Sequence, residues 1–226
     1  MDQNMQSTQA LANFPANQAK ITIEISGAPQ AVLAMQGEEA ISSGFHFQVE
    51  VLSDRYGALT SFIGACTALA FSGQDGIKRT IVGVVTKIHE LGQFDDARLR
   101  VQVTLESSLS KLQHQTDTRI ILGQSIPDII QTTCERHGIG SHQLQFDLSQ
   151  TYPVRPYTLQ ANESDWDFVQ RLAANAGLYF YSIAQDNTEV IVFTDHNAHC
   201  PYIARDLLSY IPETGTARSL RQISNL

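Results

Sequence analysis

Several features that would quickly identify a protein are scarce in this 226-residue sequence. Its three cysteines, Cys66, Cys134 and Cys200, are widely spaced and form no C-x-x-C pair. This spacing supports neither a disulfide framework nor a cysteine-rich zinc site, so we expect buried or inert thiols. Basic residues are outnumbered 15 to 23 by acidic ones, giving a net charge of −8. That balance argues against binding to nucleic acid or to an anionic membrane surface.

Long hydrophobic runs are absent as well. No segment approaches the roughly 20 apolar residues of a membrane span, and the opening MDQNMQSTQALANFPANQAK lacks the basic start and apolar core of a signal peptide. We therefore expect no membrane anchoring and synthesis in the cytoplasm. Hydrophobic residues nevertheless make up 42% of the chain, enough for the core of one large domain or two small ones.

The common catalytic motifs are missing too. The sequence contains no G-x-S-x-G elbow, no G-x-x-x-x-G-K-[ST] phosphate loop, no G-x-G-x-x-G and no H-E-x-x-H. Ser, His and Asp occur, but nothing in the sequence brings three of them together. The sequence therefore predicts no enzyme, no catalytic residue, no cofactor and no metal ligand.

Strand patterns dominate the first half of the chain. Residues 1–19 are rich in Gln, Asn and Ala and have no period, which indicates a loose arm. From ITIEIS to about residue 108, strand follows strand, and GFHFQVEVLS alternates apolar and polar residues as a half-buried antiparallel strand does. Antiparallel strands at this spacing favour a barrel or sandwich.

Two helices with the same start signal interrupt the strands. In GQSIPDIIQTTCERHGIG, Ser125 and Asp128 have capping-box spacing and Pro127 falls in the first turn. In ESDWDFVQRLAANAG, Ser164 and Asp167 repeat that spacing. The second helix is predicted to bury Phe168, Val169, Leu172, Ala173 and Ala176 and to end at Gly177. LYFYSIAQDNTEVIVFTD then reads as a β-hairpin.

Three carboxylates stand at the start of the second helix. Glu163, Asp165 and Asp167 complement the positive end of the helix dipole, a contribution of roughly 0.3–1 kcal/mol each when they are exposed. Helix positions i and i+2 do not face each other, so Asp165 and Asp167 would spread rather than converge on a metal. We favour the helix-start interpretation, and a metal or acid/base site remains the alternative.

A second group with metal-binding potential is the segment DHNAHC. His196, His199 and Cys200 are the kinds of ligand that zinc accepts, packed closely together in sequence. Such a group would still need a further ligand from elsewhere in the chain. A metal-dependent hydrolase using this group or the Asp165/Asp167 pair therefore stays an alternative function. A monomeric barrel that binds a small ligand is another.

Several segments in order resemble the amino-terminal part of the VgrG spike proteins of the bacterial type VI secretion system, which are related to contractile phage tail hub and late control D proteins. The resemblance begins at GEEAISSGFHFQVEVLS and continues through IGACTAL and RTIVGVVTKI. The most specific segments are LESSLSKLQHQTDTRIILGQSIPDIIQTTCERHGI and YPVRPYTLQANESDWDFVQRLAANAGLYFYS. The match covers about residues 37–210. Ala176 and Ile121 depart from the usual Glu and aromatic residues of the family, changes that are conservative for packing.

The resemblance identifies a structural signature rather than an active site. The positions of this chain that match the family motifs are Arg119, Ser125, Pro127, Asp128, Gln160, Glu163, Ser164, Asp165, Phe168, Arg171, Leu172, Gly177 and Tyr179. The implied fold is mainly β with two short helices (α+β), containing two related antiparallel β-barrels like those of phage tail hubs. The family would continue beyond residue 226 with an oligonucleotide-binding-type barrel and a β-helical needle, so we expect that the chain is cut from something longer.

The pattern and the resemblance together give an expected domain division. The expected parts are a flexible arm at 1–19, a first β-barrel at 20–110, a connecting segment with a helix at 111–141, a second β-barrel with helix and hairpin at 142–198, and a return segment at 199–226 that completes the first barrel.

The implied function is that of a hub. A homotrimer with two barrels per subunit matches a six-fold tube, while its needle stays three-fold. The implied partners are a hexameric Hcp-type tube, the needle and a PAAR-type tip protein, baseplate components and effectors. The protein would assemble in the cytoplasm and then be secreted or injected without a signal peptide. A baseplate hub of a contractile phage is the nearest alternative.

Overall fold

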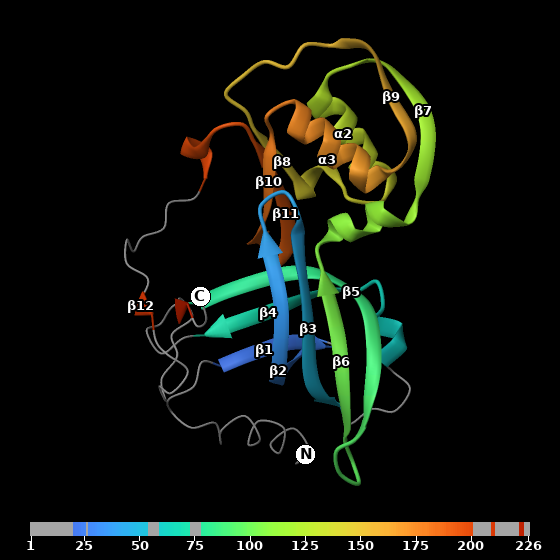
Figure 1. Ribbon diagram of the computed structural model, residues 1–226. Helices are drawn as coiled ribbons and strands as arrows, with labels where there is room; N and C mark the ends of the chain where they lie inside the picture. Colours follow the sequence, from blue (N-terminus) through green and yellow to red (C-terminus); the bar gives the residue numbers. More distant parts are fainter. Residues whose placement is uncertain are drawn as a thin grey trace.

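The chain folds into a β-barrel with a unit of mixed helices and strands at one end (Figure 1). The computed structural model describes residues 20–25, 27–53, 59–72, 78–200, 209–210 and 222–223. The predicted loose arm lies outside these residues. We call residues 20–106 the barrel and residues 107–200 the cap. In the described part of the chain, no helix has the length and apolar character needed to cross a membrane.

Six antiparallel strands make the barrel, in the order β1-β2-β3-β6-β5-β4, and pairing of β1 with β4 closes it. Their bounds, with those of the 3₁₀ helix η1, are β1 Lys20–Ile25, β2 Ala28–Ala40, β3 Gly44–Ser53, η1 Leu59–Phe62, β4 Cys66–Ser72, β5 Lys78–Gln93 and β6 Leu99–Glu106. Closure pairs both edges of every strand, which removes the open edges that promote aggregation.

Alternating side chains explain why these strands form a barrel. Along β3, Phe45, Phe47, Val49 and Val51 are buried, while the polar residues between them are partly exposed. This confirms the period-two pattern predicted for that strand. The apolar side chains of all six strands meet in one core inside the barrel, as expected for a small barrel that side chains can fill. Glu50 on the outer face of β3 bonds to Arg100 of β6 at 3.0 Å.

The cap contains two α-helices, two small sheets and short 3₁₀ turns. Its elements are η2 Ser108–His114, β7 Thr116–Gln124, α2 Ile126–Arg136, η3 Ser141–Gln143, β8 Leu144–Asp147, β9 Arg155–Ser164, α3 Asp165–Asn175, β10 Tyr179–Gln185, β11 Thr188–Thr194 and η4 Asn197–His199. Strands β10 and β11 form the predicted hairpin around Asp186 and Asn187, and β8 adds to β11 in parallel.

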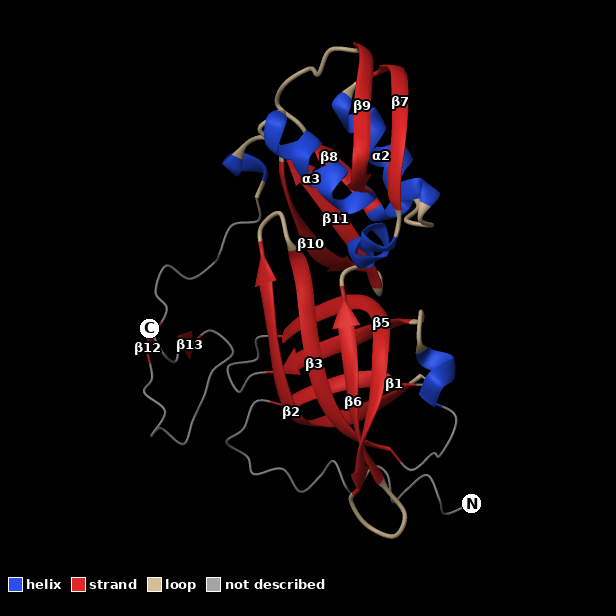
Figure 2. Cartoon of the chain, turned by 45° about the vertical axis from the view of Figure 1, so that its right-hand side comes forward, coloured by secondary structure: helices blue, strands red, loops and turns tan. Residues whose placement is uncertain are grey.

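Helices α2 and α3 lie between the three-stranded sheet and the β7–β9 ribbon (Figures 1 and 2). Their apolar faces form one core with residues of both sheets, including Ile130, Phe168, Leu172, Phe180 and Phe193. The ribbon consists only of β7 and β9, paired antiparallel. Each strand of the ribbon therefore has one edge without a partner strand in the described part of the chain.

The second barrel expected in residues 142–198 is not confirmed. These residues instead supply a three-stranded sheet, one strand of the ribbon and a helix. The segment 111–141, expected to be a connection, contributes Leu112, Ile126 and Ile130 to the same core as residues 168–193. Strand periodicity could not reveal this, because it reports which face is buried and not which strands close on each other.

The predicted return segment falls largely outside the described residues. Two short strands, β12 Ser209–Tyr210 and β13 Gln222–Ile223, pair with each other in parallel. The six strands of residues 20–106 close the barrel among themselves. A contribution of residues 199–226 to a barrel therefore stays a prediction.

Candidate functional site

Both predicted helix starts have the geometry that their sequences indicate. Ser125 Oγ accepts a hydrogen bond from the Asp128 backbone N–H, and Asp128 Oδ2 accepts one from the Ser125 N–H, completing a capping box with Pro127 in the first turn. Ser164 Oγ accepts from the Asp167 N–H at 3.0 Å. Such caps satisfy backbone donors that a helix leaves free, each worth about 1 kcal/mol.

Asp165 is the centre of a charged cluster inside the cap. Its side chain is fully buried, which differs from the exposed charge expected at a helix start. Gln160 donates to Oδ1 at 2.8 Å and Arg119 at 3.1 Å, while His137 Nε2 lies 2.6 Å from Oδ2. Arg136 Nη1 lies 3.8 Å from the same oxygen. Both carboxylate oxygens are therefore occupied by contacts within the cap.

The ribbon supplies two of the hydrogen-bond donors to this buried carboxylate. Arg119 of β7 and Gln160 of β9 are cross-strand partners on the inner face, and Arg119 Nε donates to Gln160 Oε1 at 2.6 Å. Arg119 also donates to Thr133 of α2 at 3.2 Å. A buried charge is tolerated only when it is paired and hydrogen-bonded, so this cluster ties the ribbon to both helices.

Phe168 and Arg171 extend the cluster toward the surface. Two guanidinium groups lie near the Phe168 ring, that of Arg119 at 5.6 Å and that of Arg171 at 5.4 Å from its centroid. Arg171 binds Glu163 through two hydrogen bonds of 2.5 and 3.0 Å and donates to the Leu159 carbonyl at 3.0 Å. These contacts hold the end of β9 against α3.

The remaining signature positions serve packing and chain reversal. Leu172 is buried in the cap core. Gly177 follows the end of α3 with φ at +71°, a conformation that favours glycine. Tyr179 donates to Asn197 at 2.8 Å, and its hydrogen bond with Cys200 raises the pKa of the Tyr179 hydroxyl to about 12. The cluster thus brings together Arg119, Gln160, Glu163, Ser164, Asp165, Phe168 and Arg171, and leaves Tyr179 apart from it.

The carboxylates considered for metal binding point to different partners. Asp165 faces inward, whereas Asp167 faces Ser164, whose hydroxyl donates to it at 2.6 Å. His196 and His199 have ring centroids 6.1 Å apart, and His199 Nδ1 lies 2.9 Å from the Asp147 carbonyl. Among the described residues, no group of three His, Cys, Asp or Glu side chains is arranged to hold a metal ion.

Cys134 lies beside the cluster and is the most deeply buried thiol that the structure describes. Burial, reinforced by the negative charges of Asp165 and Glu135, raises the pKa of this thiol to about 12. A thiol that stays protonated at neutral pH is a poor nucleophile. Cys134 therefore acts as an apolar packing residue of α2.

Sequence reasoning missed a second buried carboxylate, which fixes Ser107 at the joint between cap and barrel. Ser107 is the cap residue whose N–H donates to the Phe45 carbonyl of the barrel at 3.2 Å. Glu189 of β11 is fully buried and accepts hydrogen bonds from Ser107 Oγ at 2.6 Å, the Ser108 N–H at 2.6 Å and Ser182 Oγ at 2.8 Å. Ser107 and Ser108 directly follow the last barrel strand. A charged residue within the apolar run TEVIVFT was the available signal.

Ser42 makes the other polar link across this joint. It sits in the β2–β3 turn at the barrel rim, with φ at +60°. Its N–H donates to the Phe180 carbonyl at 2.8 Å, and its carbonyl accepts from Gln170 of α3 at 2.8 Å. Ser42 thus bonds the barrel rim to both β10 and α3 of the cap.

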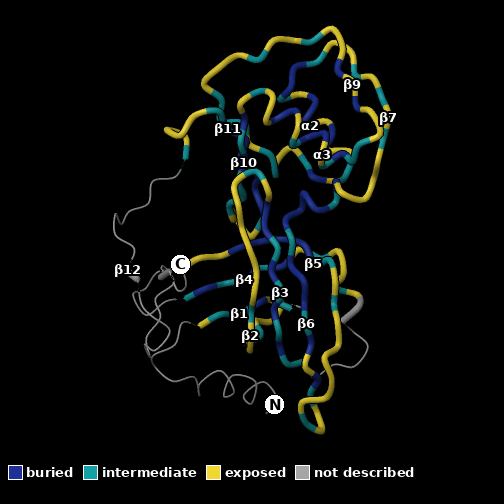
Figure 3. The backbone as a smooth tube through the Cα atoms, viewed as in Figure 1, coloured by how far each residue is buried: buried dark blue, intermediate teal, exposed yellow. Residues whose placement is uncertain are grey.

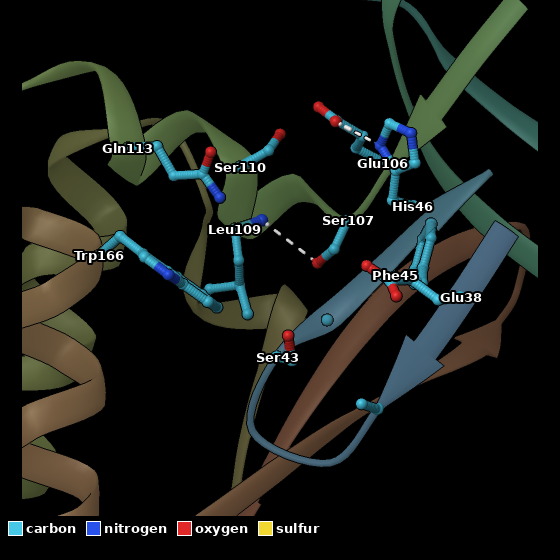
Figure 4. Close-up of a pocket in the computed structure, with 12 residues that line it drawn as sticks. Glu38, Ser43, Phe45, His46, Glu106, Ser107, Leu109, Ser110, Gln113 and Trp166 are labelled. Atoms are coloured by element: carbon cyan, nitrogen blue, oxygen red, sulfur yellow. Dashed lines mark hydrogen bonds and ion pairs between the residues drawn. The ribbon is translucent and has the colours of Figure 1, made fainter. Parts of the chain in front are cut away.

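A cleft of about 450 Å³ opens between the barrel rim and the cap (Figure 4). Trp166 of α3 and Gln113 of η2 line it from the cap, while Glu38 and the His46–Glu106 pair line it from the barrel. His46 Nδ1 and Glu106 Oε1 are 2.7 Å apart. Because its lining comes from both units, the cleft marks the boundary between the barrel and the cap.

The fold by itself indicates the class of protein. It is similar to the fold of the E. coli c3393 protein, described as a component of the type VI secretion system with structural similarity to the T4 bacteriophage tail proteins gp27 and gp5. The TM-score is 0.69 at 26% identity, and the match covers 85% of this chain and 52% of that chain. The protein thus has the fold of a tail hub.

Sequence comparison then shows the family. Residues 38–225 match the model of the phage tail baseplate hub (GPD), and the chain belongs to this family. It is also 30% identical over 205 residues to the type VI secretion system spike protein VgrG4b, and 32% identical over 209 residues to VgrG5, both of Pseudomonas aeruginosa. Each match covers 89% of this chain and 25% of the relative, so the chain spans about a quarter of their length.

Proposed function

We propose that the protein is a structural hub and spike component of a type VI secretion system. It would form a homotrimer that joins a hexameric Hcp-type tube to the puncturing needle. The observation that carries the proposal is the family match over residues 38–225 together with similarity to spike proteins over 89% of the chain. A closed barrel with a firmly joined cap suits a part that transmits force.

The proposal includes the partners and the route of the assembled protein. A PAAR-type tip protein, baseplate components and effectors would associate with the needle beyond this unit. The protein would assemble in the cytoplasm and leave the cell by injection, without a signal peptide. The signature cluster around Asp165 would keep the cap rigid within the assembly, and no catalytic step is assigned to it.

The decisive experiment measures absolute mass by light scattering on a sizing column, first alone and then with purified Hcp-type hexamer. A trimer that binds one hexamer end-on is the expected result. A monomer at every concentration would contradict trimer contacts within this chain. Failure of a trimer to bind the ring would contradict the tube contact. Glu50→Arg, on the outer face of the barrel, tests whether that face contributes to either contact.

A baseplate hub of a contractile phage is the second candidate, because the matching family model describes a phage hub. The two candidates differ in the tube they bind. Binding to a phage tail-tube protein, with no binding to an Hcp-type ring, would favour the phage assignment.

A further inference from the structure

The outer edge of β9 has the features of a strand-docking site. β9 pairs with β7 on one side, and the described part of the chain places no strand on its other side. A groove of about 510 Å³ runs along this edge, with Arg155 at one end, Tyr157 and Leu159 between, and the Glu163–Arg171 pair at the other end.

Backbone geometry shows which groups face the groove. The Leu159 carbonyl accepts from Arg171 and therefore points away from β7. In an antiparallel pair, residues of one parity direct both N–H and C=O outward. Leu159 pairs with Ile120 and Tyr157 with Leu122 without a register shift between them, so Tyr157 shares the outward orientation. The backbone groups of this edge that are left to bond another strand therefore lie on the Tyr157 side of Leu159.

The face of the ribbon beside this edge is apolar and uncharged. Ile120, Leu122, Tyr157 and Leu159 are 65%, 69%, 68% and 47% exposed and form two cross-strand pairs. Exposed residues recur along both strands of the ribbon, whereas β3 of the barrel has buried and partly buried residues only (Figure 3). A contiguous exposed apolar patch is a common mark of an interaction site.

Charge and hydrogen bonding together indicate the occupant. Arg155 has no ion-pair partner among the described residues, so it offers an uncompensated positive charge at the open end of the edge. A second copy pairing antiparallel about Leu159 would need the carbonyl that Arg171 already occupies. An extended segment that pairs with the edge nearer Tyr157 does not need the Leu159 carbonyl.

We propose that the edge of β9 binds an extended segment of another polypeptide by adding it as a strand. The segment carries an acidic side chain opposite Arg155 and apolar side chains at alternating positions over Tyr157 and Leu159. Main-chain hydrogen bonds supply the docking mode, and the alternating side chains supply the selectivity.

Fluorescence anisotropy with the full 226-residue chain tests this directly. The probes are labelled hexapeptides that alternate threonine and valine, with the one terminal valine replaced by glutamate or by lysine, so that the charge and the remaining valines share one face, and a glutamate peptide with a central proline. The glutamate peptide is expected to bind at least tenfold more tightly than the other two. Arg155→Glu should reverse the preference between the glutamate and lysine peptides.

A backbone variant tests the strand mode separately. Tyr157→Pro removes an outward N–H without removing a bond to β7, so it should weaken glutamate-peptide binding more than tenfold. Tyr157→Thr, which keeps the N–H, serves as its control. If Tyr157→Pro does not fold, the Arg155→Glu variant still tests the proposal.

Three results would overturn the proposal. They are absence of peptide binding to the unmodified chain, equal binding of the glutamate and lysine peptides, and self-association by light scattering that Arg155→Glu abolishes. The last result would show that a second copy covers the edge.

Discussion

The barrel and the cap are stabilised by different means. The barrel closes on itself, pairs every strand edge and fills its interior with apolar side chains. Among the described residues, the cap has ribbon edges without a partner strand, an exposed apolar face and two buried carboxylates, Asp165 and Glu189. Apolar burial tolerates approximate packing, whereas a buried charge needs every partner in place. The comparison teaches that both units have an apolar core, and that the cap depends in addition on a few specific polar contacts.

Removing the Asp165 carboxylate is expected to have the largest effect on the stability of the cap relative to the barrel. Asp165→Ala leaves Arg119, His137 and Gln160 without their buried acceptor, which should destabilise the cap by about 3–5 kcal/mol. The only tryptophan, Trp166, lies in the cap, so its fluorescence reports cap unfolding while far-UV circular dichroism reports the strands of both units. Asp167→Ala is the matched control on the same helix turn. Equal losses in the two variants would refute a central role for Asp165.

Disrupting the joint should separate the two units. Glu189→Ala removes the acceptor shared by Ser107, Ser108 and Ser182, a loss of about 2–3 kcal/mol for buried donors left unpaired. Denaturant unfolding followed by Trp166 fluorescence should then precede the transition seen by circular dichroism. Ser182→Ala, which removes one donor and keeps the carboxylate, should have the smaller effect. Coincident transitions in Glu189→Ala would argue against its role as the link.

Glycine substitutions should sharpen the comparison further. A Cβ at Gly83 of β5 would lie 2.5 Å from the Glu106 carbonyl oxygen and 2.8 Å from the Phe45 ring, so Gly83→Ala should cost the barrel about 1–3 kcal/mol by overpacking. At Gly177 of the cap a Cβ meets nothing within 4 Å, and only the φ of +71° opposes it, for which we expect about 1 kcal/mol. Urea denaturation measures both. A larger loss at Gly177 would contradict this division between steric and conformational causes.

The Cys134 thiol is expected to have the smallest effect near neutral pH, because its contribution to stability changes only in alkaline solution. The pKa of the Cys134 thiol is raised from 9.0 to about 12, so the folded cap keeps the proton that the unfolded chain loses. Stability from this group is fully present below pH 9 and falls as pH rises toward 12, by at most about 1.4 kcal/mol per pH unit. Cys134→Ala should flatten this decline, whereas Cys66→Ala, at an exposed thiol, should not. The same slope in all three proteins would exclude Cys134 as its cause.

Much of the local structure could be predicted from the sequence. The capping signals at Ser125 and Ser164 specify helix starts because the hydroxyl and the backbone N–H that it accepts from lie three residues apart. The alternation of β3 identifies its buried face, and Gly177 marks the end of α3. These features depend on neighbours in the chain, so the sequence displays them directly.

The candidate site was only partly predictable. The sequence selected Arg119, Gln160 and Asp165, yet it did not reveal that they meet in the cap interior. Arg119 and Asp165 are 46 residues apart, and their contact depends on the register of β7 against β9. The expected second barrel is not confirmed, and the strand pattern could not decide it, since that pattern does not specify pairing.

By itself, the sequence determined the strand-rich first half, the two capped helices and the resemblance to spike proteins, because period, capping and motif order are written along the chain. Only the tertiary structure decided that six strands close one barrel, that Asp165 and Glu189 are buried, and that no strand in the described part of the chain pairs with the outer edge of β9. Those outcomes depend on contacts between distant residues, whose free energies arise only when the whole fold brings them together.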